Sequence, residues 1–102
     1  METKTKINLL AKFVARNAFG SIIPQSSFDN SESEKIEMMI REIKDRKFGL
    51  ASDIAESVLK FKKCSEKQAY HISKYAIENG LDVQIMNMDE EIYGWMEENE
   101  LD

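Results

Sequence analysis

The sequence predicts a small, mostly α-helical domain of four or five helices, with a short extended segment at residues 81–86. Three observations support this class. The chain has 102 residues, a common size for one domain; apolar residues recur at helical spacing in several stretches; and residues that favour helix starts and ends separate these stretches. With 42% hydrophobic and 32% charged residues, the composition is that of a folded globular chain. We expect residues 1–102 to form a single domain.

The first helix is predicted over residues 4–19. Its core face comprises Ile7, Leu10, Ala11, Val14 and Ala18, widened by Leu9 and Phe13. Gly20 then favours a left-handed stop. Residues 20–30 contain the only proline of the chain, so a loop is expected there. Ile22, Ile23 and Phe28 should hold that loop against the domain.

The second helix is predicted over residues 32–47, because Ser31 and Glu34 fit a capping box in which each side chain satisfies the other's backbone amide. Its core face comprises Ile36, Met39, Ile40 and Ile43. Gly49 separates it from a third helix that ends near Lys62. The apolar stripe of the third helix comprises Leu50, Ile54, Ala55, Val58, Leu59 and Phe61. The two helices are expected to form an antiparallel hairpin.

A further helix is predicted over residues 65–79. Ser65 fits the N-cap position, Gln68 completes a capping box, and Cys64 and Ala69 occupy the positions of a hydrophobic staple. Gly80 can adopt the positive φ that ends such a helix in a Schellman motif. Its core face should carry Ala69, Ile72, Ala76 and Ile77, whose small members let a neighbouring helix approach closely.

Residues 81–86 alternate apolar and polar side chains, which is the period of a half-buried strand. The last helix is predicted over residues 88–96, behind a cap at Asn87 or Asp89. Its apolar side should comprise Met88, Ile92, Trp95 and Met96.

Charge is distributed unevenly along the chain. The formal net charge is −5, yet residues 89–102 hold seven acidic residues and no basic one. Residues 60–74 are locally basic, because they carry five lysines and one glutamate. An acidic tail and a basic patch can pair with each other or bind separate partners.

The sequence offers little to catalysis, so we expect no enzyme activity, no cofactor and no metal. Cys64 and His71 are the sole thiol and imidazole. Lys63 and a helix N-terminus could lower the pKa of the thiol, but His71 lies about two helical turns further on and cannot reach it. The chain carries no phosphate-binding glycine loop and no paired metal-ligand motif. A lone cysteine and the lack of any long apolar run favour a cytoplasmic protein without a membrane span.

Nucleic-acid binding is an open alternative, because residues 52–79 have the proportions of a helix-turn-helix motif. The candidate patch comprises Lys60, Lys62, Lys63, Lys67, Gln68, Tyr70 and Lys74. Lys67 and Lys74 would contact phosphates, and Gln68 and Tyr70 would lie nearest the base edges. Two positions depart from such motifs, which prefer Ala where this chain has Leu59 and Gly where it has Lys63.

Residues 48–77 resemble a short helical-hairpin segment of bacteriophage and mobile-element accessory proteins. The similarity is carried by Ser65-Glu66-Lys67-Gln68-Ala69-Tyr70, followed by Ile72 and Ala76. It covers under a third of the chain and implies no activity and no functional residues. It does suggest an accessory protein of a phage or mobile element, a class whose small acidic members often bind a host protein.

We therefore expect a non-enzymatic protein-interaction module that inhibits or regulates a host protein, with a small nucleic-acid binder as the alternative. The candidate partner surface comprises Ile92, Trp95, Met96, Glu97 and Glu98. Whether Trp95 lies in the core or in an interface is left open by the sequence. Exposure of all the lysines of residues 60–74 on one face, away from the acidic tail, would favour nucleic-acid binding.

Overall fold

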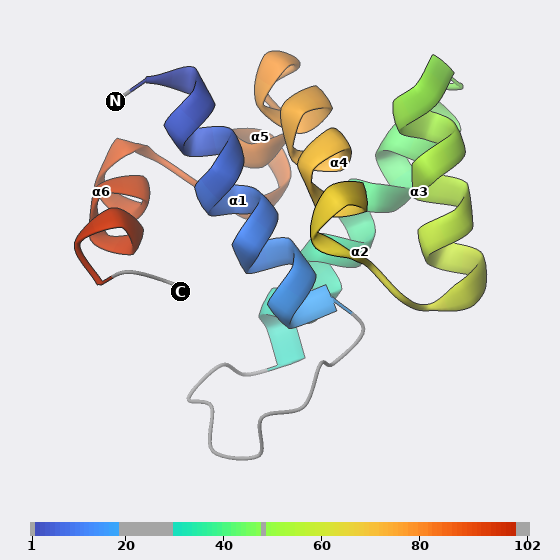
Figure 1. The fold of residues 1–102 in the computed structure, drawn as a ribbon, viewed down its shortest axis with the longest axis horizontal. Helices are drawn as coiled ribbons and strands as arrows, with labels where there is room; N and C mark the ends of the chain where they lie inside the picture. Colours follow the sequence, from blue (N-terminus) through green and yellow to red (C-terminus); the bar gives the residue numbers. More distant parts are fainter. Residues whose placement is uncertain (1, 19–29, 48, 100–102) are drawn as a thin grey trace.

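The computed structural model describes residues 2–18, 30–47 and 49–99, which form six helices and no strand (Figure 1). The helices are α1 (Thr3–Asn17), α2 (Asn30–Asp45), α3 (Gly49–Phe61), α4 (Glu66–Glu78), α5 (Leu81–Met86) and α6 (Glu90–Glu98). The expected mostly α-helical class is confirmed. Principal extents are 34 × 32 × 22 Å, with α6 and α3 at opposite ends of the longest axis.

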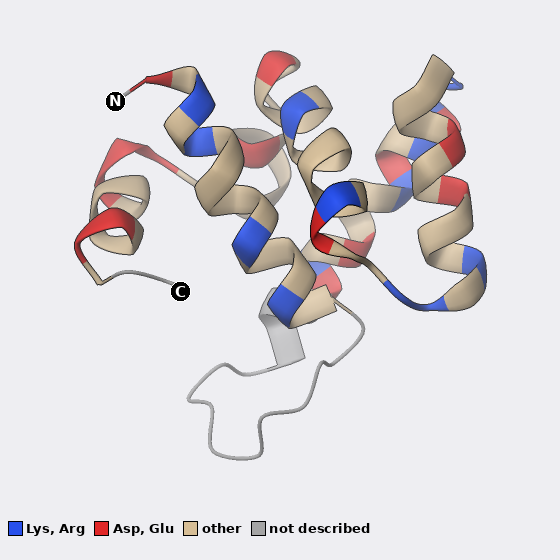
Figure 2. Cartoon of the chain, viewed as in Figure 1, with Lys and Arg blue, Asp and Glu red and all other residues tan. Residues whose placement is uncertain are grey.

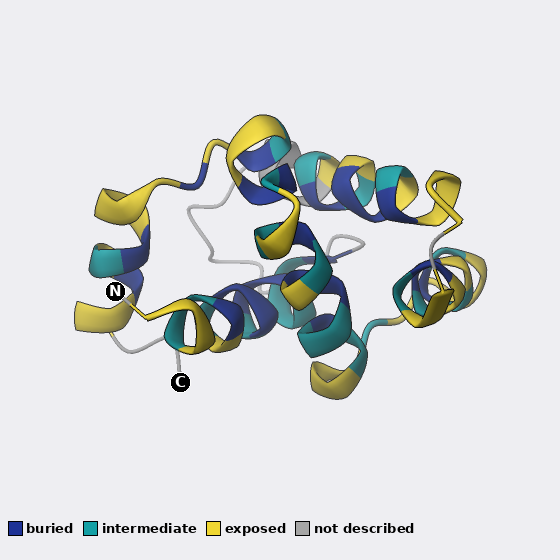
Figure 3. Ribbon diagram, turned by 90° about the horizontal axis from the view of Figure 1, so that it is seen from above, coloured by how far each residue is buried: buried dark blue, intermediate teal, exposed yellow. Residues whose placement is uncertain are grey.

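Helix α4 lies at the centre of the fold and contacts α1, α2, α3 and α5. The side of α4 that faces α1 and the core carries the small side chains of Ala69, Ser73 and Ala76, all fully buried. Their size lets α1 pack closely, as the sequence predicted. The Ser73 hydroxyl has no hydrogen-bond partner among the described residues. Viewed from above, buried residues follow the inner faces of these helices (Figure 3).

Helices α2 and α3 pack against each other, as expected of the predicted hairpin. The four predicted core residues of α2, from Ile36 to Ile43, are fully buried. The hydroxyl of Ser52 donates a buried hydrogen bond of 2.6 Å to the carbonyl oxygen of Ile43, which joins the start of α3 to the end of α2. The predicted cap was wrong, because α2 begins at Asn30 and includes Ser31 in its first turn.

The apolar stripe predicted for α3 is only partly buried. Ala55 and Val58 are fully buried, whereas Leu50 and Phe61, at the two ends of the helix, are 62% and 66% exposed. The spacing therefore identified the apolar stripe of α3 but not which of its members the core covers.

The N-terminal cap of α4 is confirmed. The backbone amide of Gln68 donates to Ser65 Oγ at 3.1 Å, and the amide of Ser65 donates to Gln68 Oε1 at 3.0 Å. Helix α4 ends before Gly80, which adopts a φ of +73° and so reverses the chain. A side chain at that position would strain the backbone, which is why glycine is favoured there.

Residues 81–86 form the short helix α5, so the predicted extended segment was wrong. Left-handed residues bracket α5 at Gly80 and Asn87, and the amide of Met88 donates to the carbonyl oxygen of Asp82 at 3.0 Å. The alternation predicted that apolar side chains would be buried and polar ones exposed, and each part of this prediction fails at one residue. Apolar Val83 is 55% exposed, and polar Asp82 is buried.

Helix α6 begins after Asp89, whose Oδ1 accepts a hydrogen bond of 2.9 Å from the amide of Ile92. Of the two caps considered, Asp89 is the one present. Tyr93 and Met96 face inward, and α6 packs against α1.

Five residues of the predicted loop lie outside the described residues, namely Gly20, Ile22, Ile23, Pro24 and Phe28. Within the described ranges, no helix has the length and apolar character needed to cross a membrane.

Candidate functional site

The outer face of α6 exposes two large apolar side chains. Ile92 and Trp95 are 37% and 55% exposed and lie one helical turn apart. Glu91 precedes Trp95 by four residues and Glu98 follows it by three, so both carboxylates belong to the same face. We call Glu91, Ile92, Trp95 and Glu98 the acidic–aromatic surface. It combines a tryptophan ring with negative charge.

The opposite face of α6 is held firmly to the domain. The Tyr93 hydroxyl donates a buried hydrogen bond of 2.7 Å to Asp82 Oδ2. Lys6 of α1 pairs with Glu90, and its Nζ lies 5.6 Å from the centre of the Tyr93 ring. Burial, followed by the Asp82 contact, raises the pKa of Tyr93, and the Lys6 contact lowers the pKa of Glu90. These contacts fix the rotation of α6 and so keep Trp95 outward.

The structure brings together three of the five predicted partner residues, namely Ile92, Trp95 and Glu98. Met96 is only 2% exposed and belongs to the core, so its assignment to the partner surface was wrong. Glu97 is exposed, but the helical spacing turns it away from Trp95. Sequence reasoning missed Glu91, although its spacing of four residues from Trp95 would have identified it.

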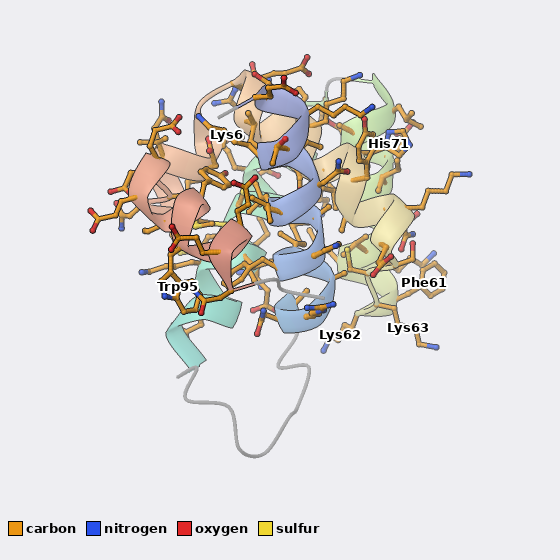
Figure 4. All side chains as sticks on the ribbon, turned by 60° about the vertical axis from the view of Figure 1, so that its left-hand side comes forward. Lys6, Phe61, Lys62, Lys63, His71 and Trp95 are labelled. Carbon is orange, nitrogen blue, oxygen red and sulfur yellow. The ribbon has the colours of Figure 1, made fainter. Side chains whose placement is uncertain are left out.

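A second charged surface lies at the far end of α3. Lys60, Phe61, Lys62 and Lys63 are consecutive and all exposed, and we call them the basic corner. Lys60 Nζ lies 5.5 Å from the centre of the Phe61 ring. The chain turns at Lys62, whose φ is +52°. Figure 4 shows Phe61, Lys62 and Lys63 together on one side of the molecule and Trp95 on the other.

The rest of the predicted nucleic-acid patch lies on α4. Lys67 and Lys74 are exposed and share the outer face of the helix with His71, because the three are spaced by three or four residues. Gln68 is half-buried and engaged in the cap of α4. Tyr70 is also half-buried, with its ring edge-on to His71 at 5.7 Å. Basic residues therefore recur along α4 after the basic corner, with the acidic Glu66 between Lys63 and Lys67 (Figure 2).

The structure gives Cys64 no catalytic setting. Its thiol is half-buried, and burial raises its pKa to about 11. Burial thus outweighs Lys63 and the helix N-terminus, which could have lowered the pKa of the thiol. Among the described residues, no group of three or more acidic, histidine or cysteine side chains could hold a metal ion.

One open cleft lies where α2 meets α3. Its volume is about 350 Å³, and its charged lining is mixed in sign. The lining residues are Lys44, Asp45, Lys47, Gly49, Ser52, Asp53 and Glu56. Two lysines and three carboxylates around an open cleft are typical of a solvated surface.

Comparison with protein-family models, with curated proteins and with solved structures finds no match for this chain. The resemblance of residues 48–77 to phage and mobile-element segments therefore stays a prediction.

Proposed function

We propose that this protein is a non-enzymatic interaction module that binds another protein through the acidic–aromatic surface and thereby inhibits or regulates it. One observation carries the proposal. Trp95 is 55% exposed on a helix whose other face is fixed by Tyr93 and by the Lys6 contacts. Tryptophan is enriched among the residues that dominate binding energy in protein interfaces. Because α6 is already held in place, presenting Trp95 needs little ordering of the backbone on binding, which favours affinity.

The chemistry of the surface defines the partner. Trp95 and Ile92 require an apolar pocket, and Glu91 and Glu98 require basic side chains at its rim. Opposite potentials of this kind accelerate association and exclude acidic competitors. The resemblance of residues 48–77 further supports a phage or mobile-element origin and a host protein as the partner.

Affinity capture with the full chain tests the proposal through matched variants. Trp95→Ala removes the ring, and Val83→Ala truncates an apolar side chain of equal exposure on α5. We expect one basic partner to be captured by the wild type and by Val83→Ala. Trp95→Ala should bind that partner at least about 30-fold more weakly, since a dominant interface residue contributes about 2 kcal/mol or more.

The charge of the surface is tested in the same way. Glu98→Gln removes a carboxylate beside Trp95, and Glu97→Gln removes one on the other side of α6. The first variant should slow association with the partner at low salt, while the second should change it little. A partner that binds Trp95→Ala as tightly as the wild type would contradict the proposal.

Nucleic-acid binding is the second candidate function. The observation that favours it is that all five lysines of residues 60–74 are exposed. Those labelled in Figure 4, Lys62 and Lys63, lie on the side away from Trp95. Such a separation is one part of the charge criterion for nucleic-acid binding, and the other part is a single face that carries all five lysines.

A further inference from the structure

We propose that the basic corner is a binding site for single-stranded nucleic acid, in which the ring of Phe61 stacks on an unpaired base. This site is separate from the acidic–aromatic surface, and the inference rests on the second candidate function, nucleic-acid binding, whose class of ligand it specifies. Phe61, which the sequence places in the apolar stripe of α3, is exposed.

The position of Phe61 explains why its ring is available. Phe61 is the last residue of α3, and the left-handed backbone of Lys62 turns the chain away immediately after it. The side chain is 66% exposed, the largest exposed fraction among the large apolar residues that the structure describes. A flat ring held at the end of a helix provides a stacking face that every base can use.

The charges around the ring suit a phosphate backbone. Lys60, Lys62 and Lys63 adjoin Phe61 in sequence, and no acidic residue interrupts residues 60–65. Lys60 Nζ lies over one face of the Phe61 ring, 5.5 Å from its centre, so a base would stack on the opposite face. Lys67 extends the positive charge onto α4. Aromatic rings combined with positive charge are the usual means of binding single strands without sequence preference.

A duplex fits the same residues less well. Its bases are already stacked on one another, so Phe61 would have no unpaired base to contact. Reading base edges would fall to Gln68 and Tyr70 on α4. Gln68 Oε1 already accepts the Ser65 amide, and Tyr70 is half-buried beside His71. The observations therefore favour a single strand over a helix-turn-helix complex with duplex DNA.

Fluorescence anisotropy with labelled oligothymidylate and oligouridylate tests the site in the full chain. Both strands should bind, because stacking and phosphate contacts require no particular sugar. Phe61→Ala should weaken binding by between about fivefold and a hundredfold, whereas Phe61→Tyr should retain most of it. Leu50→Ala is the matched control, since Leu50 is 62% exposed at the other end of α3. Both positions are exposed, so circular dichroism should show unchanged folding.

Salt dependence tests the role of the lysines. Each phosphate contact to a single strand contributes about −0.7 to the slope of log affinity against log salt. Lys63→Gln should reduce the slope by roughly that amount. The proposal is overturned if the strands do not bind, if Phe61→Ala binds as tightly as Leu50→Ala, or if Lys63→Gln leaves the slope unchanged. The proposal is also overturned if the matched duplex binds more tightly than the single strand, or if polyglutamate binds as tightly as the single strand.

Discussion

Replacing Tyr93 by Phe removes one hydroxyl from the contact that holds α6 against α5. That hydroxyl donates to Asp82 Oδ2 at 2.7 Å, and both residues are buried. A hydrogen bond to a charged acceptor contributes about 1.5–3 kcal/mol, and a buried carboxylate that loses its donor pays a desolvation penalty. For a domain of this size each kcal/mol lowers the melting temperature by about 4–8 °C. Tyr93→Phe should therefore melt roughly 10 °C lower at neutral pH.

The same substitution should change how stability depends on pH. Burial raises the pKa of Tyr93 in the folded state, whereas an unfolded tyrosine ionises near about pH 10. The stability from this group is therefore complete below that pH and is lost as pH rises above it, at about 1.4 kcal/mol per pH unit. Tyr93→Phe should lack this loss of stability. Both proteins are compared in a Cys64→Ser background, so that ionisation of the thiol does not contribute.

Thermal melts followed by circular dichroism give both quantities. Tyr70→Phe is the control, because Tyr70 is half-buried and its hydroxyl makes no hydrogen bond among the described residues. Equal melting temperatures for Tyr93→Phe and Tyr70→Phe at neutral pH would refute the role given to the Asp82 contact. A parallel alkaline decline in the wild type and in Tyr93→Phe would refute the sign of the pKa argument.

Three further predictions concern other parts of the domain. Ile40→Ala should lower the free energy of unfolding by roughly 2–4 kcal/mol, measured by urea titration, because Ile40 is fully buried. Ser65→Ala should cost about 1 kcal/mol and Ser65→Asp almost nothing, because aspartate can also accept the Gln68 amide. An equal loss for both would contradict the cap. The pKa of the Cys64 thiol, raised by burial to about 11, predicts slow alkylation at neutral pH. It also predicts a loss of stability as pH rises from about 9 to about 11, whereas fast alkylation of the folded protein would contradict the burial.

Sequence patterns predicted several parts of this fold that local chemistry determines, although the cap predicted at Ser31 was wrong. The cap of α4 depends only on Ser65 and Gln68, three residues apart, and it is present as predicted. Asp89 likewise caps α6 through the amide of Ile92. The buried face of α2 followed from its helical spacing alone, because a helix on a small core must turn its apolar stripe inward.

Residues 81–86 show where local patterns fail. Alternation over six residues is compatible with a strand, but a strand needs a partner strand, and the described residues contain none. The buried position of Asp82 depends on Tyr93, eleven residues further on. The sequence pattern could not reveal that pair, so it could not indicate that a polar side chain in this segment is buried.

The two candidate sites depend on a distinction that apolar spacing cannot make. Phe61 and Trp95 both fit apolar stripes, yet both are exposed, because neighbouring helices do not cover those positions. Within α6, Tyr93 and Met96 form the buried pair and leave Ile92 and Trp95 outside. Contacts of Tyr93 with Lys6 of α1 and Asp82 of α5 determine which pair faces inward. The spacing within α6 does not determine it.

The distance between the two surfaces determines whether they can act together. They lie on opposite sides of a domain about 34 Å long, with α6 at one end and α3 at the other (Figures 1 and 4). Charges in physiological salt are screened over about 8 Å. The carboxylates of α6 therefore cannot cancel the attraction of the basic corner for phosphates, and the net charge of −5 does not argue against that site. If both proposals hold, one molecule can bind a protein and a single strand at the same time.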